Sequence, residues 1–262
     1  MRSLPATAAA ALGAAVLSLA GGNAFAYPDT GSGGKAGARL TGVRFGVIDL
    51  RLDDGQAAGF STVAGNSELR VWHGWPDGVN RLDLPPLQAG QVGITDWSKT
   101  VAGTLGNYGE LYANAEVNYG NYDGNDLGSS AMQRLQITLA PHSALSLAGT
   151  ASASAQRDPN WPDHHNEISS AYSTIFMRSV SSPDVSVSYQ QRVDSSKPYF
   201  ASEDFMLVYA NPSDRPLLLT VQFDTGAYAT SPSIPEPGGY AMMGAGLLLI
   251  GALGRRKRGA RA

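Results

Sequence analysis

A two-residue alternation of side chains constrains this chain more than any other feature of its sequence. It is clearest at residues 145–155, where the odd positions are Leu, Gly or Ala and the even positions are Ser, Thr or Ala. A period of two places alternate side chains on opposite faces of an extended strand. No stretch between the two ends of the chain keeps the 3.6-residue period of an amphipathic helix. The sequence therefore predicts an all-β fold.

Similar runs recur along the chain, with Gly, Pro, Asn and Asp between them. Roughly ten to twelve strands at such intervals are typical of an antiparallel β-sandwich, and we predict a jelly-roll-like one over residues 38–224. The chain has no Cys, so burial and hydrogen bonds must hold the core without disulfides. The Ala and Ser side chains of residues 145–155 are small, so we expect the opposing sheet to approach closely there.

Residues 1–26 have the composition of a secretory signal peptide. A single charge at Arg2 precedes a long apolar run, and Ala24-Phe25-Ala26 fits the small residues that signal peptidase requires. We therefore predict an exported chain that begins at Tyr27. A flexible segment rich in Gly and Ser is expected at residues 27–37, and a linker at residues 225–234.

The exported part is acidic. Six of the 19 basic residues lie outside residues 27–237, which leaves 13 basic against 22 acidic residues and a net charge near −9. Such a charge disfavours nucleic acids and anionic head groups as partners, because phosphate binding needs Lys and Arg. It suits a protein of the cell surface or matrix.

The C-terminal residues 235–262 combine three features. Pro235, Glu236 and Pro237 cannot continue a helix or an inner strand, because each proline fixes φ and lacks an amide donor. Residues 240–254 carry no charge. A basic tail follows them, formed by Arg255, Arg256, Lys257 and Arg258. An apolar segment with Tyr at one end and basic residues at the other predicts a transmembrane helix.

A Pro-Glu-Pro tripeptide, an apolar segment and a basic tail in this order resemble the PEP-CTERM sorting signal of Gram-negative bacteria. The resemblance implies recognition by an exosortase, which is a membrane enzyme similar to transpeptidases, and a link to exopolysaccharide or biofilm. It also implies a precursor anchored in the inner membrane and a final place at the cell surface or in the extracellular matrix. An ordinary tail anchor that contains Pro-Glu-Pro by chance is the alternative.

Three tryptophans are candidate carbohydrate contacts. Trp72 and Trp75 lie close together at the end of an alternating run, and Trp161 lies in a second Trp-Pro-Asp loop. An exposed Trp presents a flat apolar face on which a sugar ring can stack, while neighbouring Asp and His bind hydroxyl groups. The alternative is that these rings fold back over the edge of the core.

We expect no cofactor, and calcium is the alternative, with weak candidate ligands. Asn121, Asp123, Asn125 and Asp126 supply closely spaced acceptors, but the Gly and Glu that complete an EF-hand are missing. A second acidic group contains Asp49, Asp53 and Asp54. For both groups the alternative is a turn stabilised by Asn, Asp and Gly.

No pattern of catalytic residues stands out. Thiol chemistry is excluded without Cys, and Gly-x-Ser-x-Gly is absent. We therefore expect a non-enzymatic structural or carbohydrate-contacting role, with no catalytic residues. The alternative is a surface hydrolase or metal-dependent enzyme that acts on polysaccharide, since two carboxylates suffice for glycoside hydrolysis. A purely architectural protein without a ligand is the third hypothesis.

Overall fold

Two antiparallel six-stranded sheets make up the described part of the chain. The structure is a computed structural model that describes residues 32–74, 77–95, 99–118, 126–156, 168–196 and 199–230. These residues form strands, turns and bends, and none of them is in a helix. The all-β prediction is confirmed.

The strands differ widely in length, and their bounds follow in chain order. They are β1 (Ser32–Asp49), β2 (Phe60–Gly74), β3 (Asp77–Leu84), β4 (Gly90–Ile94), β5 (Lys99–Thr104), β6 (Leu111–Asn118), β7 (Asp126–Leu139), β8 (Ser143–Gln156), β9 (Ser169–Ser179), β10 (Ser186–Asp194), β11 (Tyr199–Asn211) and β12 (Leu217–Thr230).

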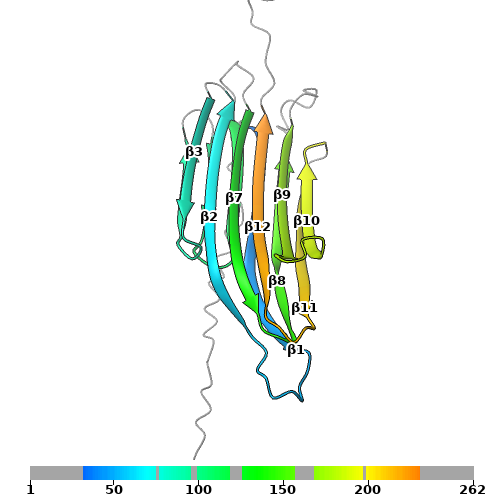
Figure 1. Cartoon of the computed structure of the whole chain (residues 1–262). Coiled ribbons are helices and arrows are strands. Elements are labelled where there is room, and N and C mark those ends of the chain that lie inside the picture. Colours follow the sequence, from blue (N-terminus) through cyan, green and yellow to red (C-terminus); the bar gives the residue numbers. More distant parts are fainter. Residues whose placement is uncertain are drawn as a thin grey trace, which may run out of the picture. The chain divides into compact units, whose positions relative to one another are not determined.

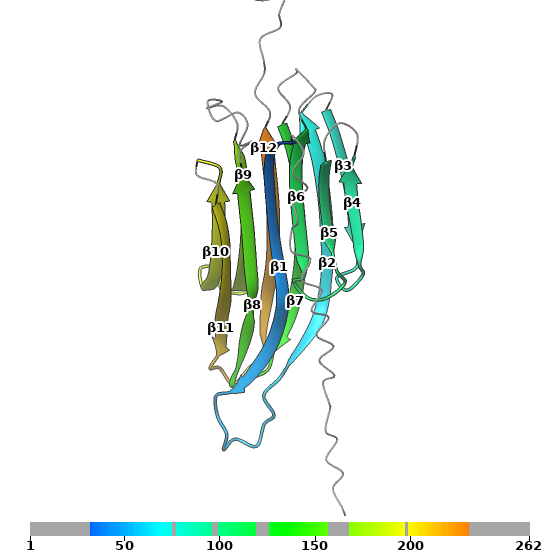
Figure 2. The ribbon, with the colours of Figure 1, turned by 180° about the vertical axis from the view of Figure 1, so that it is seen from behind.

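The sheets pack face to face as a β-sandwich. Sheet A has the strand order β11-β8-β1-β6-β5-β4, and sheet B has the order β10-β9-β12-β7-β2-β3. Figure 1 shows sheet B in front, and Figure 2 shows sheet A from the opposite side. Their inner faces bury two clusters of side chains between them.

The strands of the second half of the chain pair in a nested order. β9 pairs with β10, β8 with β11 and β7 with β12, so the second half of the chain resembles a long hairpin wrapped across both sheets. The first strand, β1, lies between β6 and β8 in sheet A. The last strand, β12, lies between β7 and β9 in sheet B.

β8 shows the alternation that the sequence predicts. Its inward residues are buried, and the residues between them are partly exposed on the outer face. The buried inward residues include Leu145, Leu147, Ala151, Ala153 and Ala155. The inward positions of β6, β7 and β12 are buried in the same way. Alternation therefore predicts correctly which face of these strands meets the opposing sheet.

The interior has a large-residue core and a small-residue core. The large-residue core holds Leu, Ile, Met and Phe side chains, with Phe223, Leu145 and Ile137 among the fully buried ones. The small-residue core consists mainly of Ala. Its members are Ala36, Ala38, Ala113, Ala115, Val117, Leu127, Ala153, Ala155, Ala171, Val193, Ala227 and Ala229. Because Ala fills little space, the two sheets must come closer here.

Hydrogen bonds between the sheets confirm this close approach. The Thr100 hydroxyl of sheet A donates to the Gly128 carbonyl of sheet B at 3.0 Å. The Ser129 hydroxyl of sheet B donates to the Asn114 carbonyl of sheet A at 2.9 Å. Side chains as short as Ser and Thr can reach the opposing backbone only where the two sheets nearly touch.

Two boundaries predicted from the sequence are wrong. β1 begins at Ser32, inside the segment expected to be flexible, and Ala36 is buried. β12 continues to Thr230, beyond the predicted start of the linker, and Ala227 and Ala229 are buried. Small residues are common in linkers, which explains both errors. Here the same residues build the small-residue core.

We expect Ala171→Leu to destabilise the protein. Ala171 is fully buried in the small-residue core, and extra methylene groups in a close-packed site cost about 1–3 kcal/mol. Ala210→Leu is the matched control, because Ala210 is exposed on β11 and surface substitutions change stability by less than about 0.5 kcal/mol. Urea unfolding of both variants measures the difference. Equal stability of the two variants would contradict the close packing.

Candidate functional site

Aromatic side chains gather on the outer face of sheet B. We call this surface the aromatic face and define it by Trp72 of β2, Tyr172 and Phe176 of β9, and Tyr228 of β12. Tyr172, Phe176 and Tyr228 each lie between two buried neighbours, and Trp72 follows the buried Val71, so all four point away from the core. All four are partly buried, which means that their rings rest on the sheet and do not extend fully into solvent.

Glycines provide the places where two of these rings lie. Trp72 is in register with Gly128 of β7, and Tyr172 is in register with Gly226 of β12. A Cβ added to Gly128 would overlap the Trp72 indole, and one added to Gly226 would overlap the Tyr172 ring. Both rings therefore lie over a neighbouring strand at positions that only glycine leaves open.

The two covered glycines are close neighbours on the sheet. Gly128 is in register with Tyr228, which is two residues along β12 from Gly226. A strand spacing of about 4.8 Å and a rise of about 3.4 Å per residue place the two glycines about 8 Å apart. β2 and β9 flank β7 and β12. The Trp72 ring therefore extends from β2 and the Tyr172 ring from β9 toward the middle of sheet B, both on its outer face.

The basic side chains nearest to β2 and β7 are engaged by acceptors on the protein. Glu68 forms ion pairs with Arg70 and with Arg81, whose Nη2 lies 3.1 Å from Glu68 Oε2. Arg134 Nε and Nη2 donate to Gln222 Oε1 at 3.0 and 2.9 Å. Arg70 and Arg81 thus face a carboxylate, whereas Arg134 keeps its positive charge because the Gln222 amide is neutral.

Asp224 is the unusual charged group of the surface. It lies on β12, in register with Met132 on one side and Thr174 on the other. Burial, together with the charge of Glu68, raises the pKa of Asp224 from 3.8 to about 6. Among the described residues, no hydrogen bond or ion pair engages its carboxylate. The centre of sheet B thus carries a half-buried carboxylate without a partner in this part of the chain.

Asp224 and Tyr172 are electrostatically linked. Burial raises the pKa of Tyr172 to about 12, and the negative charge of Asp224 adds to this effect. Tyr172 therefore remains a neutral phenol at physiological pH. Its ring and hydroxyl lie beside an acceptor, an arrangement that can contact both the flat face and the hydroxyl groups of a polar ring.

Among the described residues, Trp72 is the one predicted carbohydrate contact that the structure places on this surface. Trp75 and Trp161 lie outside the described residues, so a joint site of the three tryptophans stays a prediction. The sorting motif Pro235–Pro237 and the basic residues 255–258 also lie outside them.

The predicted calcium loop is described only at its last member. Asp126 is the first residue of β7 and is exposed, whereas Asn121, Asp123 and Asn125 lie outside the described residues. Tyr228 donates a hydrogen bond to Asp126, and burial raises the Tyr228 pKa to about 12. Within the described ranges, no group of three or more His, Asp or Glu residues is arranged to hold a metal ion. The calcium loop therefore stays a prediction.

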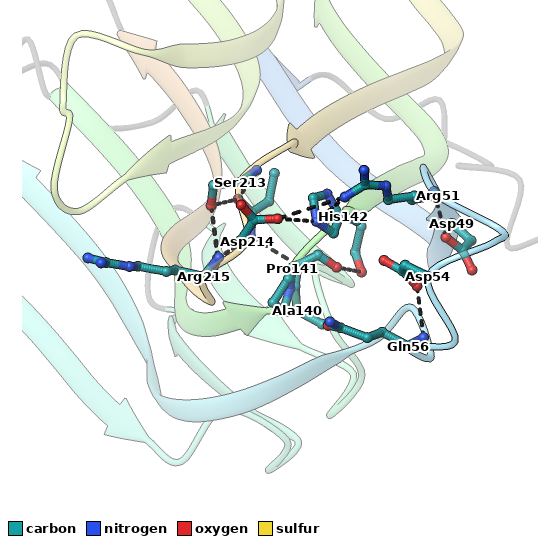
Figure 3. A network of polar contacts seen from close by, with 12 residues as sticks. Asp49, Arg51, Asp54, Gln56, Ala140, Pro141, His142, Ser213, Asp214 and Arg215 are labelled. Atoms are coloured by element: carbon teal, nitrogen blue, oxygen red, sulfur yellow. Dashed lines mark hydrogen bonds and ion pairs between the residues drawn. The ribbon is translucent and has the colours of Figure 1, made fainter.

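The second predicted acidic group lies in a turn after β1. Asp49 Oδ1 accepts the Arg51 amide at 2.8 Å, and Asp54 Oδ1 accepts the Gln56 amide at 2.8 Å (Figure 3). These are the contacts by which Asp stabilises turns. Two of the three proposed calcium ligands, Asp49 and Asp54, therefore have a local structural role.

His142 joins this turn to two others (Figure 3). Its Nε2 donates to Asp214 Oδ1 at 2.7 Å, and its carbonyl accepts the Leu50 amide at 2.8 Å. The His142 φ is +48°, a conformation that is uncommon for a residue with a Cβ. We interpret this cluster as structural, because its contacts connect the turns at residues 50–59, 140–142 and 212–216.

Sequence reasoning missed Tyr172, Phe176, Tyr228 and Asp224 as parts of one surface. Alternation shows that each points away from the core once its strand is recognised. It does not show that β7, β12 and β9 follow β2 across the sheet, because that order comes from pairing between distant segments.

Comparisons with known proteins add no further residues to this site. No protein-family model, curated protein or solved structure matches the chain. In the part of the chain that the structure describes, no helix is long and apolar enough to cross a membrane. The predicted transmembrane segment at residues 240–254 lies outside that part.

We expect Asp224→Asn to stabilise the protein above pH 6. Folding raises the pKa of this carboxyl from 3.8 to about 6, so the folded state holds the proton more tightly and stability falls as the pH rises through this window. After allowance for solvent screening, removal of the charge should add about 1 kcal/mol to the free energy of unfolding at about pH 8. It should add much less near pH 4. Urea unfolding at both pH values tests this, and an equal gain at both would contradict it.

Proposed function

We propose that this protein is a non-enzymatic protein of the cell surface or extracellular matrix, and that it contacts carbohydrate through the aromatic face. The observation that carries the proposal is that the Trp72 and Tyr172 rings lie over glycines on one outer surface. Flat rings with polar groups around them suit sugar rings, which have apolar faces and hydroxyl edges.

We also propose that the exported protein is sorted through its C-terminal residues. The support is the order of Pro235-Glu236-Pro237, the uncharged segment and the basic tail, and its resemblance to PEP-CTERM signals. Signal peptidase and an exosortase are the processing partners in this proposal, and the C-terminal helix anchors the precursor in the inner membrane. Sorting would deliver the aromatic face to a location rich in exopolysaccharide.

The sandwich itself we propose to be jelly-roll-like. The support is the nested pairing of β9 with β10, β8 with β11 and β7 with β12, in which successive pairs alternate between the two sheets.

One observation favours a second candidate, a polysaccharide hydrolase. Asp224 has a raised pKa and lies two strands from Glu68, with about 10 Å between their backbones. A protonated acid and a carboxylate base at such separations occur in inverting glycosidases. Against this function, both Arg70 and Arg81 pair with the Glu68 carboxylate, which would make it a poor base.

We expect Trp72→Ala and Tyr172→Ala each to weaken polysaccharide binding about tenfold, because each removes a flat apolar ring. Tyr112→Ala is the matched control. The Tyr112 ring also lies over a glycine, Gly103, but on the outer face of sheet A. A polysaccharide array probed with the purified variants measures the effect.

Equal loss in the Tyr112 control would point to general destabilisation and would contradict a binding role for the aromatic face. Release of reducing sugar ends by the wild-type protein, abolished in Asp224→Asn, would favour the hydrolase instead.

We expect replacement of Glu236 by Ala, or deletion of residues 255–258, to change processing of the C-terminal tail. The reason is that both alterations remove parts of the proposed exosortase signal. Mass spectrometry of the protein recovered from cells would report the C-terminus in each case. Unchanged processing in both variants would reject the sorting proposal and leave an ordinary tail anchor.

A further inference from the structure

We propose that the aromatic face selects glycans without acidic groups, and that Asp224 is the residue that determines this selectivity. The inference rests on the proposed carbohydrate contact and goes further by naming the class of ligand. It is carried by the position of Asp224 and by the lack, among the described residues, of a cation paired with its carboxylate.

Asp224 lies where a sugar on the Tyr172 ring would meet it. The Tyr172 ring covers Gly226, which is two residues from Asp224 on the outward side of β12. The backbone of Asp224 therefore lies about 7 Å along β12 from the glycine beneath the ring, and its side chain is on the same face of the sheet. A ligand stacked on Tyr172 places its edge within reach of this carboxylate.

An ionised carboxylate only accepts hydrogen bonds. No hydrogen bond or ion pair within the described residues engages this one, so the hydroxyl groups of a neutral glycan can donate the hydrogen bonds that these residues do not supply. An acidic sugar at the same place would bring a second negative charge close to Asp224. Repulsion between like charges is stronger at a half-buried site than in water.

Most cations on this surface are held by other groups, and none of the described ones forms an ion pair with Asp224. Arg70 and Arg81 pair with Glu68, and Arg134 donates to Gln222. The guanidinium of Arg178 lies over the Phe176 ring, with its Cζ 5.5 Å from the ring centroid. Arg134 and Arg178 keep their positive charge, because their partners are neutral, but the charge that acts on the Asp224 carboxyl is that of Glu68, which raises its pKa.

Arg192 is the exception and provides the competing hypothesis. It is in register with Tyr172 on the edge strand β10, it is exposed, and no ion pair holds it among the described residues. An exposed charge is screened by solvent and salt, so we expect it to attract acidic ligands less than Asp224 repels them. Because Arg192 and Asp224 predict opposite preferences, the two residues can be tested against each other.

The experiment uses matched pairs of neutral and acidic ligands. The probes are oligosaccharides of glucan, mannan and galactan, each with a counterpart oxidised at C6 to the uronic acid, so that the two members of a pair differ in charge at one carbon. Affinities for the wild-type protein, Asp224→Asn and Arg192→Gln are measured by titration at about pH 8. Asp224→Asn keeps the shape of the side chain and removes its charge.

We expect the wild-type protein to bind the neutral member of a recognised pair at least about fivefold more tightly. Asp224→Asn should bring the two affinities within about twofold, mainly through a gain for the acidic member. Arg192→Gln should keep or enlarge the preference for the neutral member. Equal affinities in the wild type, an unchanged ratio in Asp224→Asn, or an acidic preference that Arg192→Gln removes would overturn the inference.

The two proposals fail in different ways in this experiment. If the wild type binds no probe at all, the proposed carbohydrate contact and the inference both fall. If it binds both members of a pair equally and Trp72→Ala weakens both, the contact stands and the selectivity falls.

A measurement at about pH 5 adds an independent readout, because protonation of Asp224 should reduce the selectivity while the uronic acid stays charged. The other charged or titratable groups around Asp224 are Glu68 and Arg70 of β2, Arg134 of β7, Tyr172 of β9 and Arg192 of β10.

Discussion

The contact between the two sheets at Gly128 is the constraint on which much of the structure depends. On one side its carbonyl accepts the Thr100 hydroxyl from sheet A. On the outer side its missing side chain provides the place where the Trp72 indole lies. The Ala residues around this point keep the sheets close enough for such short bridges. Larger inward residues would separate the sheets and break the bridges, and β7 would shift beneath the Trp72 ring.

Small residues thus have two functions in sheet B, one on each face. Inward Ala residues allow close packing, and outward Gly128 and Gly226 let aromatic rings lie low on the surface. On the same surface the carboxylate of Asp224, which no described residue pairs with, carries an energetic cost, as its raised pKa indicates. Perturbed carboxyl groups are concentrated at functional sites. The coincidence of covered glycines and one costly acid is the reason to regard this face, and not the turn cluster around His142, as the candidate site.

Alternation alone predicts a large part of this fold. The faces of β6, β7 and β8 follow from their apolar positions, because a period of two has one structural interpretation in an extended strand. The beginning of β1 and the end of β12 did not follow, since their Gly, Ala and Ser residues are common in linkers as well as in close-packed strands. The outward position of Trp72 could be inferred, but its proximity to Tyr172 and Asp224 depends on a strand order that local pattern does not encode.

The central position of β12 has a mechanical consequence. β12 is hydrogen-bonded along most of its length to β7 on one side and β9 on the other, and residues 231–262 continue the chain from its end. Ladder hydrogen bonds run perpendicular to the strands. A pull along the strand from its C-terminal end therefore loads both ladders in shear at the same time, whereas an edge strand could be peeled away one bond at a time. The strand that precedes the tail is thus the one best placed to bear tension.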